Sequence, residues 1–218
     1  MDILEISIKT DNLAPTAAFY ADVLGFPLGS KGQDFISFLA GQSTLTFIQS
    51  TNQNPCYHFA FNIPHNKLDE AIEWAKSRFT LIIDADNSIV TDFENWNASA
   101  VYFYDNNNNI LEFIARYDLS NTTDQAFGVS SILSISEIGI VADAPLDLAE
   151  KLVGENNIPF YSKGPKTDSF TALGDDNGLL VMVATNRKWY PTDHLAKKHF
   201  TKVKLSANGS VSELTFNN

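Results

Sequence analysis

The clearest alternation of hydrophobic and polar positions is in residues 98–117. Two β-branched and aromatic runs, residues 101–104 and 110–114, are separated by Asp105 and four asparagines. Asparagine and aspartate accept positive φ and bond to their own backbone, so this segment predicts a β-hairpin. Because side chains alternate across a strand, Glu112 lies between two isoleucines on one face. A single carboxylate there either reaches water at the rim of a sheet or needs a partner.

The start of the chain has a second pattern, and this pattern recurs. An alternating strand at residues 4–8 runs through a short polar turn into an apolar helical pattern. The tetrapeptide EISI, which begins at Glu5, is echoed by EIGI, which begins at Glu137. Each of these glutamates precedes an aspartate by six positions. The sequence therefore contains an internal repeat.

Four segments follow this plan with decreasing completeness. Residues 1–50 and 56–117 each predict a strand, a helix and three strands, and residues 131–185 predict the same order more weakly. The polar stretch 118–130 is predicted to be a linker. The remainder, to residue 218, resembles a fourth segment reduced to one or two strands.

Composition excludes several classes of function. The chain has 218 residues, 44% of them hydrophobic and 12% aromatic, which is enough for a sizeable core. Its net charge of −11 disfavours nucleic acid and anionic membrane surfaces as partners. No apolar run approaches the roughly 18 residues of a membrane helix, and Met1 begins directly on a strand pattern. The single cysteine, Cys56, makes a cytoplasmic protein the expectation, although a cysteine-poor secreted protein remains open.

Three motifs together resemble one family. The run DNLAPTAAFYADVLGF, the strand YHFAF and the hairpin YFYDNNNNILEF are similar to the vicinal oxygen chelate superfamily, which includes glyoxalase I, extradiol dioxygenases and the fosfomycin and bleomycin resistance proteins. The resemblance implies an α+β fold of paired βαβββ modules that curve into a half-barrel. About three and a half modules are expected: a bimodular domain at 1–117, then a third module with a truncated fourth at 131–218.

The resemblance also implies a set of metal ligands. In the superfamily they come from the first and last strands of each module and face one cavity, expected here within residues 1–117. The first-strand positions fall on Glu5 and His58, and the last-strand positions fall on Thr46 and Glu112. We therefore expect Glu5, His58 and Glu112 to hold a divalent ion, Mn²⁺, Fe²⁺, Ni²⁺ or Zn²⁺, with Glu5 replacing the commoner histidine. Glu112 is also the candidate catalytic residue, and Thr46 is expected to face the substrate.

The third module is expected to add no site of its own. Val181 stands where Glu112 stands in the second module, and Lys202 stands where His58 stands. Neither a valine nor a protonated lysine binds a metal ion. This module and the tail could instead serve as a packing or dimerisation surface, which leaves a homodimer possible.

Two functions remain open for the small-molecule site. The first is a metal-dependent lyase, isomerase or ring-cleaving dioxygenase. The second is a metal-free binding protein of the bleomycin-resistance type, with an aromatic pocket. Without metal, two inward carboxylates repel, so that one takes up a proton or pairs with a cation such as Lys9. His58 could then be a core histidine bonded to a tyrosine. The residues proposed to line the pocket are Trp96, Tyr102, Tyr104 and Trp189.

Overall fold

The computed structural model describes residues 1–51 and 53–217, and in these residues thirteen strands form two sheets. The first module contains β1 (Asp2–Thr10), α1 (Leu13–Ala18), β2 (Leu28–Lys31), β3 (Phe35–Ala40) and β4 (Ser43–Gln49). The second contains β5 (His58–Ile63), α2 (Leu68–Lys76), β6 (Thr91–Phe93), β7 (Ala98–Tyr104) and β8 (Ile110–Arg116). The third contains β9 (Ser134–Ala142), α3 (Pro145–Asn156), β10 (Phe170–Asp175) and β11 (Gly178–Ala184). The tail forms β12 (Thr201–Ala207) and β13 (Ser210–Phe216). Short helical turns lie at Phe19–Val23, Glu94–Trp96 and Val129–Ser131.

Each of the three modules is closed by a parallel pair of strands. The first strand of a module lies beside its last strand, so that β1 pairs with β4, β5 with β8, and β9 with β11. A parallel pair needs a long crossover, which the helix and the intervening strands supply. The first two modules have the βαβββ plan that the sequence pattern predicts, whereas in the third module the first strand after the helix is reduced to a single bridge, Phe160 with Leu173. Together with the small share of helix this strand order confirms the α+β fold class.

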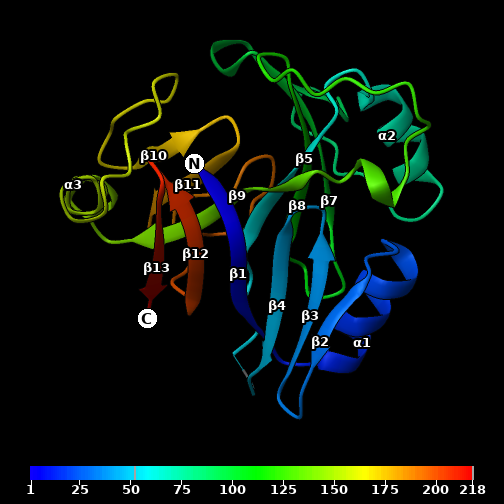
Figure 1. Ribbon diagram of the computed structural model, residues 1–218, viewed down its shortest axis with the longest axis horizontal. Helices are drawn as coiled ribbons and strands as arrows, with labels where there is room; N and C mark the ends of the chain where they lie inside the picture. Colours follow the sequence, from blue (N-terminus) through cyan, green and yellow to red (C-terminus); the bar gives the residue numbers. More distant parts are fainter. Residues whose placement is uncertain (52, 218) are drawn as a thin grey trace.

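The modules pair in a different order from the expected one. The six-stranded sheet, sheet A, has the order β13-β12-β1-β4-β3-β2, and the seven-stranded sheet, sheet B, has the order β10-β11-β9-β5-β8-β7-β6. Sheet B thus joins the second module to the third through the antiparallel pair β5–β9, whereas sheet A joins the first module to the tail through β1–β12. The expectation of one cavity within residues 1–117 is therefore wrong. Figure 1 shows β5 beside β8 and β9, and β1 between β4 and β12.

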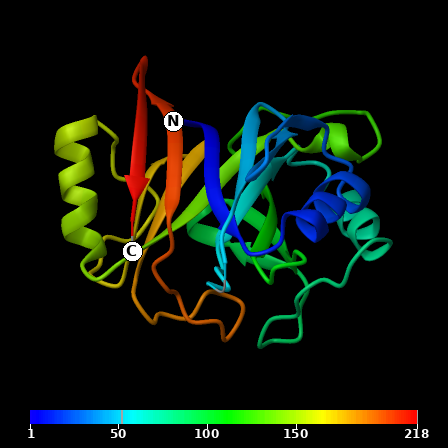
Figure 2. The same cartoon turned by 90° about the horizontal axis from the view of Figure 1, so that it is seen from below.

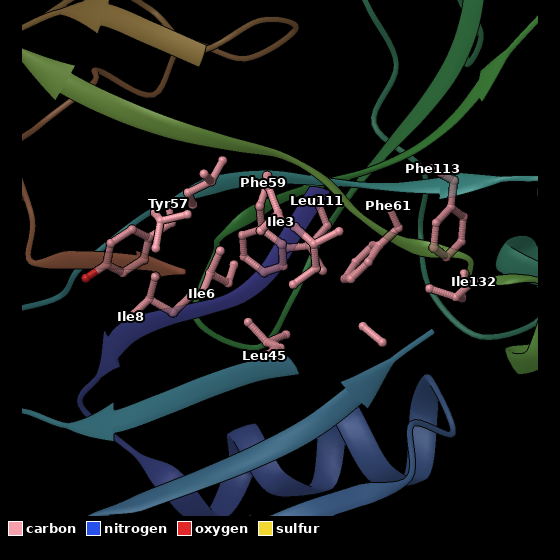
Figure 3. Close-up of a cluster of buried hydrophobic side chains, with 14 of the residues drawn as sticks. Ile3, Ile6, Ile8, Leu45, Tyr57, Phe59, Phe61, Leu111, Phe113 and Ile132 are labelled. Atoms are coloured by element: carbon pink, nitrogen blue, oxygen red, sulfur yellow. The ribbon is translucent and has the colours of Figure 1, made fainter. Parts of the chain in front are cut away.

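The main core lies between the two sheets. In Figure 3, Ile6, Ile8 and Leu45 of sheet A face Phe59 and Phe61 of β5. Phe61 also meets Phe26 edge-on, with ring centroids 5.4 Å apart. Figure 2 shows α3 at one end of the molecule and α1 with α2 at the other. The sheets therefore share one apolar layer, and each turns its opposite face away from it.

Sheet B is buried on both faces at its centre. Every residue of β5 and β8 is buried, as are the central residues of β9 and β11. Strands covered on both sides have nearly continuous apolar sequences. A charged residue in such a strand is costly to bury unless it is paired. The buried charged residues of β8 and β9, which are Glu112, Arg116 and Glu137, therefore mark a candidate functional site.

The helices differ from the predicted ones in detail. The helix expected at residues 14–24 is α-helical only to Ala18 and continues as a π-helical turn, Phe19–Val23. Gly25 ends it with φ +76°. This turn buries Tyr20 completely. None of the helices in the described residues is long and apolar enough to cross a membrane.

The asparagine-rich hairpin is held by a buried carboxylate. Oδ1 of Asp105 accepts hydrogen bonds from the backbone amides of Asn107 (2.8 Å) and Asn109 (2.9 Å). Its Oδ2 accepts from the side-chain amide of Asn109 at 2.7 Å and from the hydroxyl of Tyr20 at 2.8 Å. Since Tyr20 belongs to the first module, Asp105 links the two sheets through hydrogen bonds that are hidden from water.

We predict that Asp105→Asn lowers the free energy of unfolding by about 1–3 kcal/mol, because the new NH₂ group would face two donors where Oδ2 now accepts. Urea denaturation followed by circular dichroism measures this. The matched control is Asp84→Asn in a surface loop. Oδ1 of Asp84 accepts from the amides of Asp86 and Ser88, an arrangement that asparagine can reproduce. The control should change stability by no more than about 0.5 kcal/mol, and equal effects of both substitutions would contradict the prediction.

Candidate functional site

A cavity of about 370 Å³ lies on the face of sheet B that is turned away from the core. Its floor comes from β5, β8 and β9, so the second and third modules build it together. Val181 of β11 also lines it. The aromatic residues of its wall are Phe93, Trp96, Tyr102, Phe170, Trp189 and Tyr190.

Three side chains that can bind a metal ion converge on the floor. They are His58 of β5, Glu112 of β8 and Glu137 of β9, all buried. Strand register explains why they meet: Ala60 pairs with Glu112 on one side and with Glu137 on the other, and His58 lies two residues before Ala60 on the same face. One ligand atom from each residue lies within 4.8 Å of the others. No other such group of three occurs in residues 1–51 and 53–217.

His58 is oriented by the neighbouring strand. Its Nδ1 lies 3.1 Å from the carbonyl oxygen of Ile110, which can only accept, so Nδ1 carries the proton. Burial lowers the pKa of His58 to about 4, and the hydrogen bond to Ile110 opposes this only in part. The imidazole is therefore neutral near pH 7, and Nε2 presents a lone pair to the cavity. Nε2 of His58 lies 3.7 Å from Oε2 of Glu112. Because the imidazole is neutral at this pH, the two groups do not form an ion pair.

Glu112 is the least satisfied group of the site. The side chain is buried, and among the described residues its Oε1 has no hydrogen-bond partner. Burial raises its pKa well above the ordinary value, the charge of Glu137 raises it further, and Arg116 opposes the rise. Burial therefore favours the neutral form of Glu112.

Glu137 is stabilised by a buried arginine. Arg116 is completely buried and donates from Nη2 to Oε1 of Glu137 in a close contact. Its Nη1 lies 3.5 Å from Oδ1 of Asp176, and Oδ2 of Asp176 accepts from Nζ of Lys163 at 2.6 Å. Burial raises the pKa of Glu137, but contact with Arg116 opposes the rise. Glu137 is thus the carboxylate that keeps its charge.

A glycine makes room for the wall of the cavity. A Cβ at Gly139 of β9 would lie 2.5 Å from the indole of Trp189, which is closer than carbon atoms can approach. The indole therefore packs directly on β9, with its ring centroid 5.2 Å from that of His58. The first module has Ser7 at the equivalent position of the repeat. Of these two strands, only β9 therefore has room for the indole of a tryptophan.

The structure brings together some of the predicted site residues and separates others. His58 and Glu112 meet as expected, and Tyr102 and Trp96 line the same cavity. The prediction that Glu5 joins them is wrong, because Glu5 lies in sheet A, where its Oε1 accepts from Thr46 at 2.9 Å. Thr46 is therefore also remote from the cavity.

Tyr104 stacks on His194, with centroids 5.4 Å apart, rather than lining the cavity. Lys9, a candidate partner for the inward carboxylates, lies over the ring of Phe200. The buried cation beside these carboxylates is Arg116, which pairs with Glu137.

The third module contributes more than expected. It supplies Glu137, Val181 and Phe170, and the loop that follows it supplies Trp189 and Tyr190, although Val181 does leave the fourth ligand position without a donor. Sequence reasoning did not assign a role to Glu137, Arg116 or Arg187. A signal existed for two of them: Glu137 occupies the position of Glu5 in the repeat, and strand alternation puts Arg116 on the face of Glu112.

Comparisons with known proteins bear on the fold. No protein-family model and no curated protein sequence gives a significant match. Among solved structures, a "putative dioxygenase" from Bacillus subtilis superposes with a TM-score of 0.58 at 17% identity, over 84% of this chain. This chain spans 63% of the length of that protein.

Two shorter proteins superpose less well. A glyoxalase/bleomycin resistance protein/dioxygenase from Alicyclobacillus acidocaldarius gives a TM-score of 0.43 at 21% identity, over 54% of this chain and 92% of its own. The fosfomycin resistance protein FosX from Listeria monocytogenes, in complex with Mn(II) and sulfate, gives 0.42 at 18% identity, over 53% of this chain and 89% of its own. With the βαβββ order of the first two modules, the first comparison confirms the α+β fold that the resemblance to the vicinal oxygen chelate superfamily implied.

Proposed function

We propose that the cavity between the second and third modules binds a small molecule beside a divalent metal ion held by His58, Glu112 and Glu137. One observation carries the proposal. A neutral imidazole nitrogen and two carboxylates converge at the closed end of an aromatic cavity, and Oε1 of Glu112 has no partner among the described residues. A buried polar atom without a partner is rare in native proteins and calls for an explanation.

The donor set fits such an ion. One nitrogen and two carboxylate oxygens suit Mn²⁺, Fe²⁺, Ni²⁺ or Zn²⁺, and three protein ligands leave positions for a substrate. Arg116 contacts Oε1 of Glu137, and Oε2 lies free of that contact. The hydrogen bond from His58 to Ile110 fixes the ring orientation, as outer hydrogen bonds do for metal-binding histidines. A bound divalent ion would act as a Lewis acid that polarises substrate oxygens.

The protein's own groups would then position the substrate and move a proton. Burial raises the pKa of Glu112, which makes it the candidate group for releasing or accepting a proton. The aromatic wall keeps water from the floor and lies flat against a planar substrate. The activities that this supports are those of a metal-dependent lyase, isomerase or ring-cleaving dioxygenase in the cytoplasm.

One observation favours a second function. Arg116 already neutralises Glu137 through a buried contact, so that the floor is stable without any ion. The cavity could then bind a small molecule without catalysis, as sequestering proteins of the bleomycin-resistance type do. Metal binding separates the two functions.

We predict that metal-depleted protein binds one divalent ion and that a hundredfold excess over Kd raises the melting temperature by about 5–10 °C. Thermal unfolding with Mn²⁺, Fe²⁺, Ni²⁺ and Zn²⁺ measures this. His58→Ala should weaken binding at least about 100-fold and keep the fold, because it removes the nitrogen ligand from a cavity wall.

The matched pair for this experiment is Glu137→Gln and Glu5→Gln, which alter equivalent positions of the repeat. Only the first should weaken metal binding, since Glu5 lies in the other sheet. Circular dichroism must show that the Glu137 variant is folded, because it leaves Arg116 with a weaker partner. Binding that survives both His58→Ala and Glu137→Gln would refute the metal site and favour the metal-free function.

We further predict that metal binding releases about one proton at pH values below the raised pKa of Glu112. Below its raised pKa Glu112 carries a proton that the ion must displace, whereas His58, with a pKa of about 4, has none to lose from Nε2. Affinity should therefore increase as the pH rises towards the pKa of Glu112, by at most about tenfold per pH unit. Calorimetry in two buffers of different ionisation enthalpy counts the protons. Binding without proton release would show that Glu112 is either ionised beforehand or not a ligand.

A further inference from the structure

Arg187 is the one cavity-lining charge whose role the site described above does not explain. It belongs to the loop after β11 and lines the cavity together with Phe170 and Trp189. Its guanidinium lies over the ring of Phe170, 4.9 Å from the centroid, and Nη1 donates to the carbonyl oxygen of Lys188 at 3.2 Å. In the part of the chain that the structure describes, no carboxylate oxygen lies within 4 Å of this guanidinium.

A half-buried arginine without an acidic partner is unusual. Burial removes water from the guanidinium, and this loss normally requires a carboxylate or phosphate in exchange. Stacking on Phe170 compensates in part and fixes the plane of the group. The remaining N–H donors of Arg187 therefore lie at the wall of an aromatic cavity in a fixed orientation. This arrangement is expected for the recognition of an anion.

The distribution of charge in the cavity points the same way. Arg116 contacts Glu137 on the floor, whereas Arg187 lines the wall beside Phe170 and has no carboxylate oxygen within 4 Å among the described residues. The chain as a whole has a charge of −11, so attraction of an anion depends on this local positive charge.

The wall of the cavity suits a flat ring. Phe93 and Trp96 are stacked with centroids 5.6 Å apart, and Tyr190 meets both Phe93 and Tyr102 edge-on. A volume of about 370 Å³ falls in the range of small-molecule sites. Aromatic walls alone also suit a quaternary ammonium ion, but the charge of Arg187 on the wall opposes a cation.

From these observations we infer that the ligand of this cavity is a planar aromatic carboxylate, with its ring between the aromatic side chains and its carboxylate on Arg187. The inference rests on the proposed function in taking the same cavity as the binding site. It does not require a metal ion.

The test is calorimetry of metal-depleted protein with three probes of the same size: 2-naphthoate, 2-naphthamide and 2-naphthylmethylammonium. We expect 2-naphthoate to bind at least tenfold more tightly than the neutral amide and the cation to bind most weakly. Arg187→Met keeps the length of the side chain but removes its charge, and it should abolish the preference for naphthoate over naphthamide. Arg187→Lys should retain part of that preference.

The matched control is Arg78→Met. Arg78 also lies over an aromatic ring, 4.1 Å from the centroid of Trp74, but it does not line the cavity. This variant should keep the full preference for naphthoate. Equal affinity for naphthoate and naphthamide, tighter binding of the cation, no detectable binding of naphthoate, or an unchanged preference in Arg187→Met would each overturn the inference.

Repeating the titrations with bound Mn²⁺ separates this inference from the proposed function. Preference for naphthoate in protein that binds no metal would defeat only the metal site. Metal binding without any preference for naphthoate would defeat only the assignment of an aromatic carboxylate.

Discussion

The antiparallel pairing of β5 with β9 is the constraint on which the site depends. It places Glu137 opposite Ala60, and the parallel pair β5–β8 places Glu112 opposite the same residue from the other side. His58 is two residues away on the same face. Backbone hydrogen bonds of three strands therefore fix the spacing of all three side chains, which makes the site more rigid than one built on loops.

Burying two carboxylates in the centre of a sheet requires compensation within the protein. A lone ionised carboxylate there would either lose its charge or destabilise the fold. Arg116 neutralises one of the two, and burial raises the pKa of Glu112 and so favours its neutral form. The site is therefore stable without a bound ion and yet retains one carboxyl group and one imidazole nitrogen whose bonding capacity is unused. Such a site can gain binding energy from a cation without depending on it for folding.

The two sheets use the same repeat for different purposes. Glu5 and Glu137 stand at equivalent positions, but Glu5 bonds to Thr46 and Ser7 within sheet A. In sheet B the loop that carries Arg187 and Trp189 covers the face of Glu137, and Gly139 lets the indole pack against the strand. The tail strands β12 and β13 complete sheet A beyond β1. Sheet A thus acts as the scaffold against which sheet B packs its apolar side.

Local patterns in the sequence were sufficient for the modules themselves. Alternation identified the strands around Glu112, the asparagine run identified their turn, and the echo of EISI in EIGI identified the third module, because each of these features depends on neighbours within a few residues. The resemblance to the superfamily, carried by these motifs, predicted that His58 and Glu112 meet in one site. The choice between Glu5 and Glu137 could not be made in this way, since both belong to first strands that can pair with β5 equally well by local criteria. Tertiary structure decided it: β9 joins β5, and β12 takes the free edge of β1. Pairing between distant strands depends on which apolar faces pack together, as Ile6 and Ile8 do with Phe59 and Phe61, and that packing involves the whole chain at once.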